Sequence, residues 1–198
     1  MAALSPRVTF YFDLGSPYAY LTAERVSALF TEVGLEQPEW QPILLGGLFR
    51  ALGRDSWGNG PEREGGMAEV ERRAAEYGLP PIAWPEPWPG NMLTAMRAAT
   101  FAKQTGRCVS FALAAFRQGF AAGRDLSDPD NVLLAAASCE LHPRAVLKAI
   151  ETKAVKGALR EETDRAAELG VVGVPSLRVG DAVFWGDDRV EEAVAAAS

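Results

Sequence analysis

The fold of this chain is decided by residues 9–21, which read TFYFDLGSPYAYL. The residues before Asp13 are apolar on both faces of an extended segment, which predicts a strand that is covered on both sides. Gly15 permits a tight turn, and Ser16 followed by Pro17 is typical of the N-cap and first position of a helix. The Ser16 hydroxyl should therefore lie at the positive end of a helix, where open α/β folds bind ligands. Whether Ser16 only caps this helix or also takes part in chemistry stays open at this point.

The next segments extend this strand and helix into a β-α-β unit. An apolar stripe continues the helix to Gly34, a residue type that favours a helix end. Residues 39–45 predict a second strand, parallel to the first because a helix separates the two. Pro38 and Pro42 place that strand at an edge of the sheet, since proline cannot donate a ladder hydrogen bond.

Residues 46–170 show helical patterns and no stretch that is typical of a strand. The segment opens with residues 46–61, which are rich in glycine and polar side chains and for which we expect a loop. Residues 80–90 are rich in proline and tryptophan and predict an extended connection. A long helix over residues 153–169 ends the segment.

The C-terminal part returns to strands. Residues 176–179 and 182–185 predict a β-hairpin, and residues 190–197 predict a final helix. A β-α-β half followed by a β-β-α half is typical of an α/β thioredoxin-like fold, here with an all-helical domain inserted between the halves. We therefore expect a thioredoxin-like domain built from residues 1–45 and 154–198, and an inserted helical domain formed by residues 46–153.

The composition of the chain excludes several classes of function. Its 198 residues carry a formal net charge of −6, so no broad positive surface is expected for nucleic acid or an anionic membrane. No apolar run approaches the roughly 20 residues that span a bilayer, and the N-terminus shows no signal-peptide pattern before the first strand. We therefore predict a cytoplasmic protein that binds neither nucleic acid nor membranes.

The cysteines and the single histidine point away from redox and metal chemistry. Cys108 and Cys139 lie far apart in helical patterns, which favours buried reduced thiols over a disulfide. His142 precedes a proline at a helix start and has no partner at metal-ligand spacing, so we predict no metal site. With its only histidine in a loop, the chain is also a poor match for a serine hydrolase triad.

Two C-terminal motifs could join Ser16 in one site. Val174-Pro175 directly precedes a strand, where the peptide bond could be either cis or trans. Gly186-Asp187-Asp188-Arg189 opens the last helix. Its free backbone N–H groups beside two carboxylates suit a ligand that carries both an ammonium and a carboxylate group, such as an α-amino acid. Simple capping by aspartate is the plainer interpretation of the second motif, and both interpretations stay open.

The motifs with the highest specificity are FYFDLGSPYAY at 10–20 and the pair GVP at 173–175 and FWGDDR at 184–189, supported by LLGGLF at 44–49 and AMRAA at 95–99. In these motifs, and over nearly its whole length, the chain resembles the family of 2-hydroxychromene-2-carboxylate isomerases and kappa-class glutathione transferases. That family is a branch of the DsbA-like thioredoxin superfamily, in which a helical domain is inserted in the thioredoxin core.

The resemblance implies that Ser16 is catalytic. Ser16 matches the serine that hydrogen-bonds the sulfur of glutathione and favours the reactive thiolate. It replaces the first cysteine of the redox CxxC motif, and Ala19 replaces the second, so dithiol–disulfide exchange through this motif is excluded. Val174 stands before Pro175, for which the resemblance implies a cis peptide bond, and would pair its backbone with the cysteinyl unit of glutathione.

Of the other positions that contact glutathione in this family, some carry the same type of residue in this chain and others do not. Asp187 and Asp188 match the positions that hold the γ-glutamyl head, and Arg63 falls where the kappa class has a lysine that contacts glutathione. In the kappa class an asparagine also contacts glutathione. The residue at that position here is Arg54, and Asn59 follows five residues later. Either of the two, or neither, makes this contact. The side chains that we expect to line the rest of the pocket are Tyr18, Arg54, Trp57, Asn59, Trp88 and Asn91.

The activity implied by this resemblance is that of a glutathione-dependent isomerase of the 2-hydroxychromene-2-carboxylate isomerase type, with glutathione or another low-molecular-weight thiol as cofactor. Reversible addition of the thiolate to an aromatic or conjugated carbonyl substrate would allow rotation about the transiently saturated bond. Two alternatives remain: a kappa-type transferase or peroxidase that consumes the thiol, and a DsbA-like relative of the oxidoreductases without dithiol activity. The family often forms homodimers, so a homodimer is a further expectation. The enzyme interpretation requires that Ser16, Val174 and Asp188 line one cavity.

Overall fold

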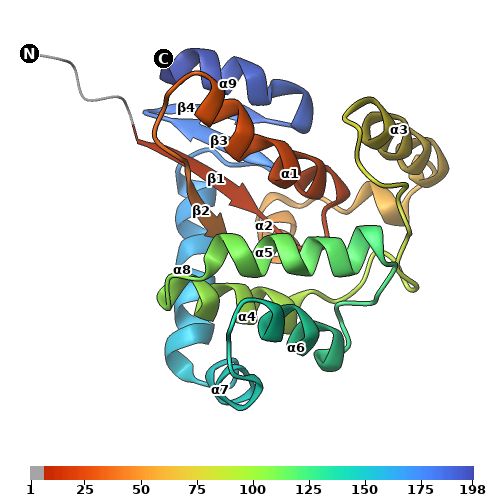
Figure 1. The fold of residues 1–198 in the computed structure, drawn as a ribbon, viewed down its shortest axis with the longest axis vertical. Coiled ribbons are helices and arrows are strands. Elements are labelled where there is room, and N and C mark those ends of the chain that lie inside the picture. The colour runs from red at the N-terminus through yellow and green to blue at the C-terminus, as the bar shows by residue number, and fades with distance from the viewer. Residues whose placement is uncertain (1–6) are drawn as a thin grey trace, which may run out of the picture.

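A mixed sheet of four strands lies at the centre of residues 7–198, which the computed structural model describes (Figure 1). Its strands are β1 (Val8–Phe12), β2 (Glu39–Pro42), β3 (Ser176–Val179) and β4 (Ala182–Trp185), in the order β2-β1-β3-β4. β1 runs parallel to β2 and antiparallel to β3, which pairs with β4 as the predicted hairpin. The predicted thioredoxin-like fold is confirmed, and β2 occupies the predicted edge.

Helices join and cover the two halves of the sheet. α1 (Pro17–Glu32) follows β1, and α9 (Val190–Ala197) follows the hairpin and packs against α1. Between β2 and β3 lie α2 (Leu45–Leu52), a 3₁₀ turn (Trp57–Asn59), α3 (Arg63–Glu76), α4 (Leu93–Gln104), α5 (Cys108–Phe116), a π-helical turn (Arg117–Ala121), α6 (Pro129–Ser138), α7 (Pro143–Ala149) and α8 (Lys153–Glu168). Within residues 7–198, no helix combines the length and the apolar character that crossing a membrane requires.

The side chains of β1 alternate between two hydrophobic clusters, one on each face of the sheet. Phe10 and Phe12 belong to the larger cluster, which also contains side chains of α1, α4, α5 and α9. Tyr11 belongs to the smaller cluster, together with side chains of α2 and α8. Both faces are therefore covered, which explains why apolar residues occupy successive positions of this strand.

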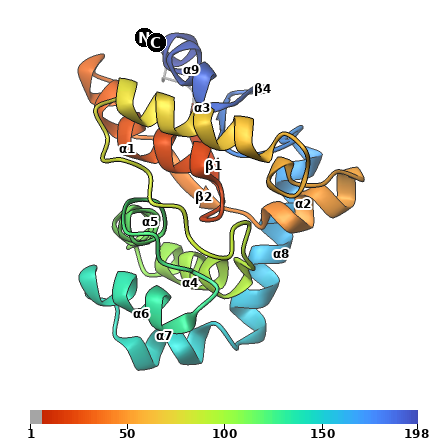
Figure 2. The same cartoon turned by 90° about the vertical axis from the view of Figure 1, so that its right-hand side faces the viewer.

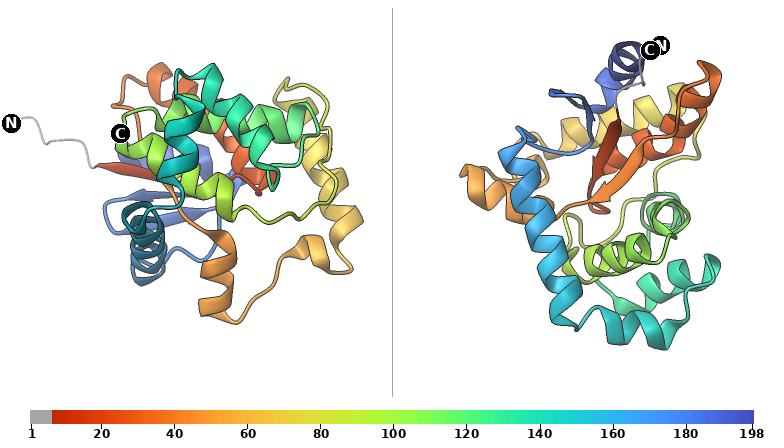
Figure 3. Two further views of the ribbon diagram at one scale, coloured as in Figure 1. Left: turned by 90° about the horizontal axis from the view of Figure 1, so that it is seen from below. Right: turned by 90° about the vertical axis from the view of Figure 1, so that its left-hand side faces the viewer.

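Two of the helices between β2 and β3 bring this segment back to the β-α-β unit: α3 packs against α1, and α8 packs against β2. α3 lies alongside α1 (Figure 2), and α8 returns the chain from α7 to the sheet (Figure 3). α8 packs against both α2 and α4 on the way. As a result, α2 and α3 both reach the carboxyl end of β1, where Ser16 lies.

α2 is a helix where the sequence predicts a loop. Two contacts from distant parts of the chain fix its start: Asp13 Oδ2 accepts a hydrogen bond from Leu45 N at 2.8 Å, and Thr163 Oγ1 accepts one from Leu44 N at 2.9 Å. Two glycines in the first turn disfavour a helix by about 1 kcal/mol each. The tertiary contacts outweigh that local cost, and β2 consequently ends at Pro42, before the predicted end of the strand.

Candidate active site

Ser16 lies in the turn between β1 and α1, and its side chain is buried. Its hydroxyl oxygen accepts a hydrogen bond from the backbone N–H of Ala19 at 3.2 Å, which is the predicted N-cap interaction. The same hydroxyl donates to the carbonyl oxygen of Val174 at 3.4 Å. The peptide bond between Val174 and Pro175 is cis, as the resemblance implies. Ser16 therefore caps its helix and also joins the two distant halves of the sheet.

A cavity of about 430 Å³ opens beside Ser16 and is called the Ser16 cavity below. Its volume falls in the range of small-molecule sites, about 300–1,000 Å³. Ser16, Val174 and Asp188 all line it, as the enzyme interpretation requires. The other lining residues with functional side chains or a predicted role are Tyr18, Arg54, Asp55, Ser56, Trp57, Arg73, Trp88, Pro175, Trp185 and Asp187.

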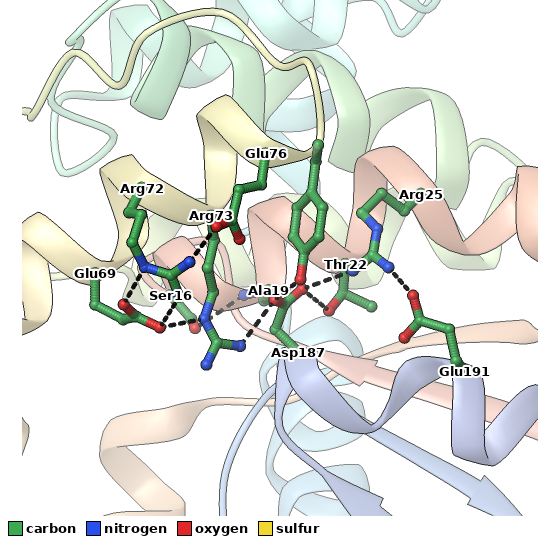
Figure 4. A network of polar contacts seen from close by, with 11 residues as sticks. Ser16, Ala19, Thr22, Arg25, Glu69, Arg72, Arg73, Glu76, Asp187 and Glu191 are labelled. Atoms are coloured by element: carbon green, nitrogen blue, oxygen red, sulfur yellow. Dashed lines mark hydrogen bonds and ion pairs between the residues drawn. The ribbon is translucent and has the colours of Figure 1, made fainter.

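Asp187 is the centre of a polar network at one wall of the Ser16 cavity (Figure 4). Its carboxylate is 1% exposed and accepts hydrogen bonds from Thr22 Oγ1 at 3.2 Å and Tyr77 Oη at 2.9 Å. It also forms ion pairs with Arg25 at 3.4 Å and Arg73 at 3.2 Å. Because α1 and the C-terminal end of α3, including its C-cap Tyr77, supply all four partners, the side chain of Asp187 holds these two helices against the 3₁₀ turn (Asp187–Arg189) that precedes α9.

Tyr77 is held in its protonated form by this network. Burial, together with the neighbouring Asp187 carboxylate, raises the pKa of Tyr77 to about 12. The Arg25 guanidinium also lies over the Tyr77 ring, 3.6 Å from its centroid. The phenol therefore remains a hydrogen-bond donor to the carboxylate at neutral pH.

Asp188 differs from Asp187 in its exposure and in having no side-chain partners among residues 7–198. Its side chain is exposed, lines the Ser16 cavity, and makes no hydrogen bond or ion pair to another side chain among residues 7–198. Of the two aspartates that the resemblance assigns to the γ-glutamyl head, only Asp188 thus has a carboxylate without protein partners. Asp187 lines the cavity with oxygens that the protein itself already engages.

Trp57 and Trp88 form an aromatic wall of the Ser16 cavity. Their ring centroids are 4.9 Å apart, and the Tyr18 ring lies 5.9 Å from that of Trp57. Trp88 Nε1 donates to the carbonyl oxygen of Gly15 at 3.1 Å, which ties this wall to the turn that carries Ser16. The three aromatic residues predicted for the pocket therefore lie together at the cavity.

Arg63 lies behind the aromatic wall and is not among the residues that line the Ser16 cavity. Its guanidinium donates to the carbonyl oxygens of Trp88 and Gly58, and it lies 5.3 Å from the centroid of the Trp88 ring. In this position the Arg63 guanidinium supports the aromatic wall from outside the cavity.

The three polar residues predicted for the pocket, Arg54, Asn59 and Asn91, line two different cavities. Arg54 lines the Ser16 cavity, and its Nη1 donates to the carbonyl oxygen of Val172 at 3.1 Å. Asn59 and Asn91 line a neighbouring cavity of about 560 Å³ between α2 and the start of α4. Arg54 lines that cavity too, so it stands where the two spaces meet.

Arg73 is a cavity residue that the sequence analysis missed. It lies on the side of α3 that carries the buried Val70. Arg72 and Arg73 both pair with Glu69 of their own helix, but Arg73 also reaches Asp187. The sequence feature that could have identified Arg73 as a site residue is its position on the apolar stripe of an amphipathic helix. The stripe alone could not show which distant carboxylate Arg73 meets.

Asp13 is a second buried acid next to Ser16, and the sequence analysis gave it no role. Its Oδ1 accepts from Gly15 N at 2.8 Å and its Oδ2 from Leu45 N at 2.8 Å, so one carboxylate links the Ser16 turn to α2. Burial raises the pKa of Asp13 to about 6, even though the two backbone hydrogen bonds favour the charged form.

We expect Asp13 to make the stability of the protein depend on pH. Its pKa is higher in the folded chain, about 6, than its ordinary value of 3.8, so the folded state binds this proton more tightly. The resulting stabilisation is complete below pH 3.8 and is lost as the pH rises through 6; its upper bound is about 3 kcal/mol. Urea unfolding of wild type and Asp13→Asn should therefore show wild type losing stability relative to the variant between pH 4 and pH 7.

The matched control for Asp13 is Asp181→Asn, because Asp181 lies in the exposed turn of the β3–β4 hairpin. The difference between wild type and this variant should stay nearly constant over the same pH range. A pH-independent difference between wild type and Asp13→Asn would contradict the raised pKa.

Both cysteines lie outside the Ser16 cavity. They are free thiols, and burial raises the pKa of Cys108 to about 12, which leaves it unreactive at neutral pH. Within residues 7–198, no group of His, Cys, Asp and Glu side chains is arranged to hold a metal ion. His142 is exposed and caps α7, where its Nδ1 accepts from Arg144 N.

Curated relatives match this chain over most of its length. The 2-hydroxychromene-2-carboxylate isomerase of Sphingobium xenophagum is 28% identical over 191 residues, which cover 95% of this chain and 96% of that protein. The protein of the same name from Pseudomonas sp. (strain C18) is 29% identical over 194 residues, which cover 92% of this chain and 86% of that protein. Relatives of this name support an enzyme that acts on a small molecule.

Solved structures and a family model agree on the fold. A 2-hydroxychromene-2-carboxylate isomerase structure superposes with a TM-score of 0.84 at 24% identity, covering 96% of this chain and 93% of that chain. The cytosolic disulfide reductase DsbM from Pseudomonas aeruginosa with GSH superposes with a TM-score of 0.62 at 12% identity, covering 96% and 95%. The model of the DSBA-like thioredoxin domain matches residues 7–197. Because that match spans nearly the whole chain, this protein belongs to the family of DSBA-like thioredoxin domains.

Proposed function

We propose that this protein is a glutathione-dependent isomerase of the 2-hydroxychromene-2-carboxylate isomerase type. The names of its curated relatives support the reaction. The observation that carries the proposal is the position of the Ser16 hydroxyl, at the positive end of α1 and 3.4 Å from the carbonyl oxygen of Val174 in the same cavity. A hydroxyl and a helix N-terminus together stabilise a thiolate.

The chemistry of the cavity walls fits glutathione. The exposed carboxylate of Asp188 suits the ammonium of the γ-glutamyl head. The guanidinium groups of Arg54 and Arg73 suit the two carboxylates of glutathione, one on the γ-glutamyl unit and one on the glycine. Backbone groups of Val174 lie next to Ser16, where the cysteinyl unit would place its sulfur. The aromatic wall leaves an apolar side for a conjugated substrate.

The thiol would supply the nucleophile that adds reversibly to the conjugated double bond of the substrate and leaves after rotation about that bond. Ser16 would turn its O–H from the Val174 carbonyl toward the sulfur and hold the thiolate by a hydrogen bond. α1 adds the positive end of its dipole to that interaction. Asp187 takes no proton in this scheme, because its contacts to Thr22, Arg25, Arg73 and Tyr77 serve to keep the cavity wall in place.

Asp188 provides a direct test of glutathione binding. Asp188→Asn should raise the Kd for glutathione about tenfold or more, because a charge-assisted hydrogen bond to the ammonium is worth about 1.5–3 kcal/mol. Stability should change little, since the side chain is exposed. Isothermal titration calorimetry measures the first quantity and urea unfolding the second. Equal affinity in wild type and Asp188→Asn, with Asp181→Asn as the matched surface control, would remove Asp188 from the site.

The activity itself is tested with 2-hydroxychromene-2-carboxylate, with and without glutathione. We expect isomerisation that requires catalytic glutathione and leaves its concentration unchanged. A stable glutathione conjugate would instead identify a kappa-type transferase. Equal rates without any thiol would contradict the cofactor, and no isomerisation with any low-molecular-weight thiol would contradict the reaction.

A further inference from the structure

A basic cavity of about 580 Å³ lies between α2, α4 and α8, of which α8 packs against both other helices (Figure 2). It shares no lining residue with the Ser16 cavity. Four cationic side chains from the three helices line it: Arg50, Arg97, Lys156 and Arg160. In a chain with a formal net charge of −6, four cations around one cavity are an unusual local concentration.

Acidic side chains neutralise only part of this charge. Asp164 lines the cavity and pairs with Arg160 at 3.7 Å, and Glu151 pairs with Lys156 at 2.7 Å outside it. Arg50 and Arg97 have no carboxylate within 4.0 Å among residues 7–198. Two guanidinium groups, one from α2 and one from α4, therefore line the cavity without a carboxylate within 4.0 Å among residues 7–198.

Arg97 gives a second and independent indication of a ligand. Its Nε is buried and has no hydrogen-bond partner among residues 7–198. A buried donor without an acceptor costs about 1–3 kcal/mol, and more when the group is charged. Arg97 itself is half-buried, and its chain neighbours Met96 and Ala98 are fully buried in the core, so packing fixes the position of this part of α4. An anion in the cavity would compensate the charge of the Arg97 guanidinium.

The rest of the lining defines the class of anion. Leu44, Leu93 and Leu159 supply apolar walls beside the arginines. We propose that this cavity binds a small organic carboxylate with an apolar body, its carboxylate held by Arg50 and Arg97 and its body by the three leucines. A guanidinium binds a carboxylate through two parallel hydrogen bonds, which suits this pair of arginines.

The test uses sodium benzoate as the probe in calorimetric titrations of the full chain at low salt. We expect saturable binding that weakens at least tenfold in Arg97→Gln and in Arg50→Gln. Arg50 is exposed, so its substitution keeps the test valid if the Arg97 variant folds poorly. The matched control is Arg144→Gln, an exposed arginine of α7 that does not line the cavity and should leave the affinity unchanged. Affinity should also fall as salt is raised.

Three outcomes would overturn the proposal. The first is no binding of benzoate at millimolar concentration, and the second is equal affinity in all three arginine variants, which would place the bound benzoate elsewhere. The third is binding of inorganic phosphate at least as tight as that of benzoate, because the leucines would then play no part. The two arginines tested here do not line the Ser16 cavity on which the proposed isomerase activity rests, so failure of either proposal leaves the other standing.

Discussion

Replacing Ser16 with alanine should lower glutathione-dependent turnover by about 10²-fold, the size of effect seen when one preorganised donor to a developing anion is removed. The hydroxyl is the side-chain donor next to the carbonyl of Val174, where the sulfur is expected. Loss of the N-cap interaction with Ala19 should cost about 1 kcal/mol of stability at the same time. Turnover at saturating glutathione, measured beside the midpoint of urea unfolding, separates the two effects.

Thr152→Ala is the matched control for this experiment. Thr152 caps α8 by the same kind of interaction, with its Oγ1 accepting from Val155 N at 3.2 Å, and it lies outside the Ser16 cavity. It should lose a similar amount of stability and keep its turnover. If both variants lose activity in proportion to stability, Ser16 is a cap and nothing more.

Replacing Asp187 with alanine should cost about 3–5 kcal/mol of stability, since it removes a buried carboxylate that two arginines, Thr22 and Tyr77 all contact. Arg73 would keep only Glu69 as an acidic partner, and the Tyr77 hydroxyl would lose its acceptor. Glutathione binding should weaken as well, because Arg73 lines the Ser16 cavity. Urea unfolding and calorimetry measure the two losses on the same protein samples.

Glu191→Gln serves as the control for Asp187, because Glu191 also pairs with Arg25 but with an exposed side chain. An exposed pair contributes about 0–1 kcal/mol, so this variant should be nearly as stable as wild type. A similarly small loss in Asp187→Ala would show that the network in Figure 4 does not hold α3 to α1.

The parts of the fold that were predicted correctly are those in which local sequence and tertiary structure agree. Ser16 and Pro17 begin α1, and the two-residue turn at residues 180–181 joins β3 to β4, because each feature depends on residues within a few positions of one another. The juxtaposition of Ser16 with Val174 is different. It followed from the resemblance to a known family, since no local pattern relates residues so far apart.

The parts that were not predicted depend on contacts between distant residues. α2 begins with glycine-rich sequence and forms because Asp13 and Thr163 bind its first N–H groups. The adjacent aspartates 187 and 188 look equivalent in the sequence, yet one is surrounded by donors from α1 and α3 and the other faces the cavity. Arg73 is likewise distinguished from Arg72 only by what lies across from it.

The larger hydrophobic cluster has a consequence for how the protein unfolds. The Phe12 ring of β1 lies 5.8 Å from the Trp40 ring of β2 and 5.9 Å from the Phe116 ring of α5, so the sheet and the inserted helices share one apolar interior. Melting the helices alone would expose the aromatic face of the sheet to water. The two segments of the sheet and the helices between them should therefore unfold as one cooperative unit, although they alternate along the chain.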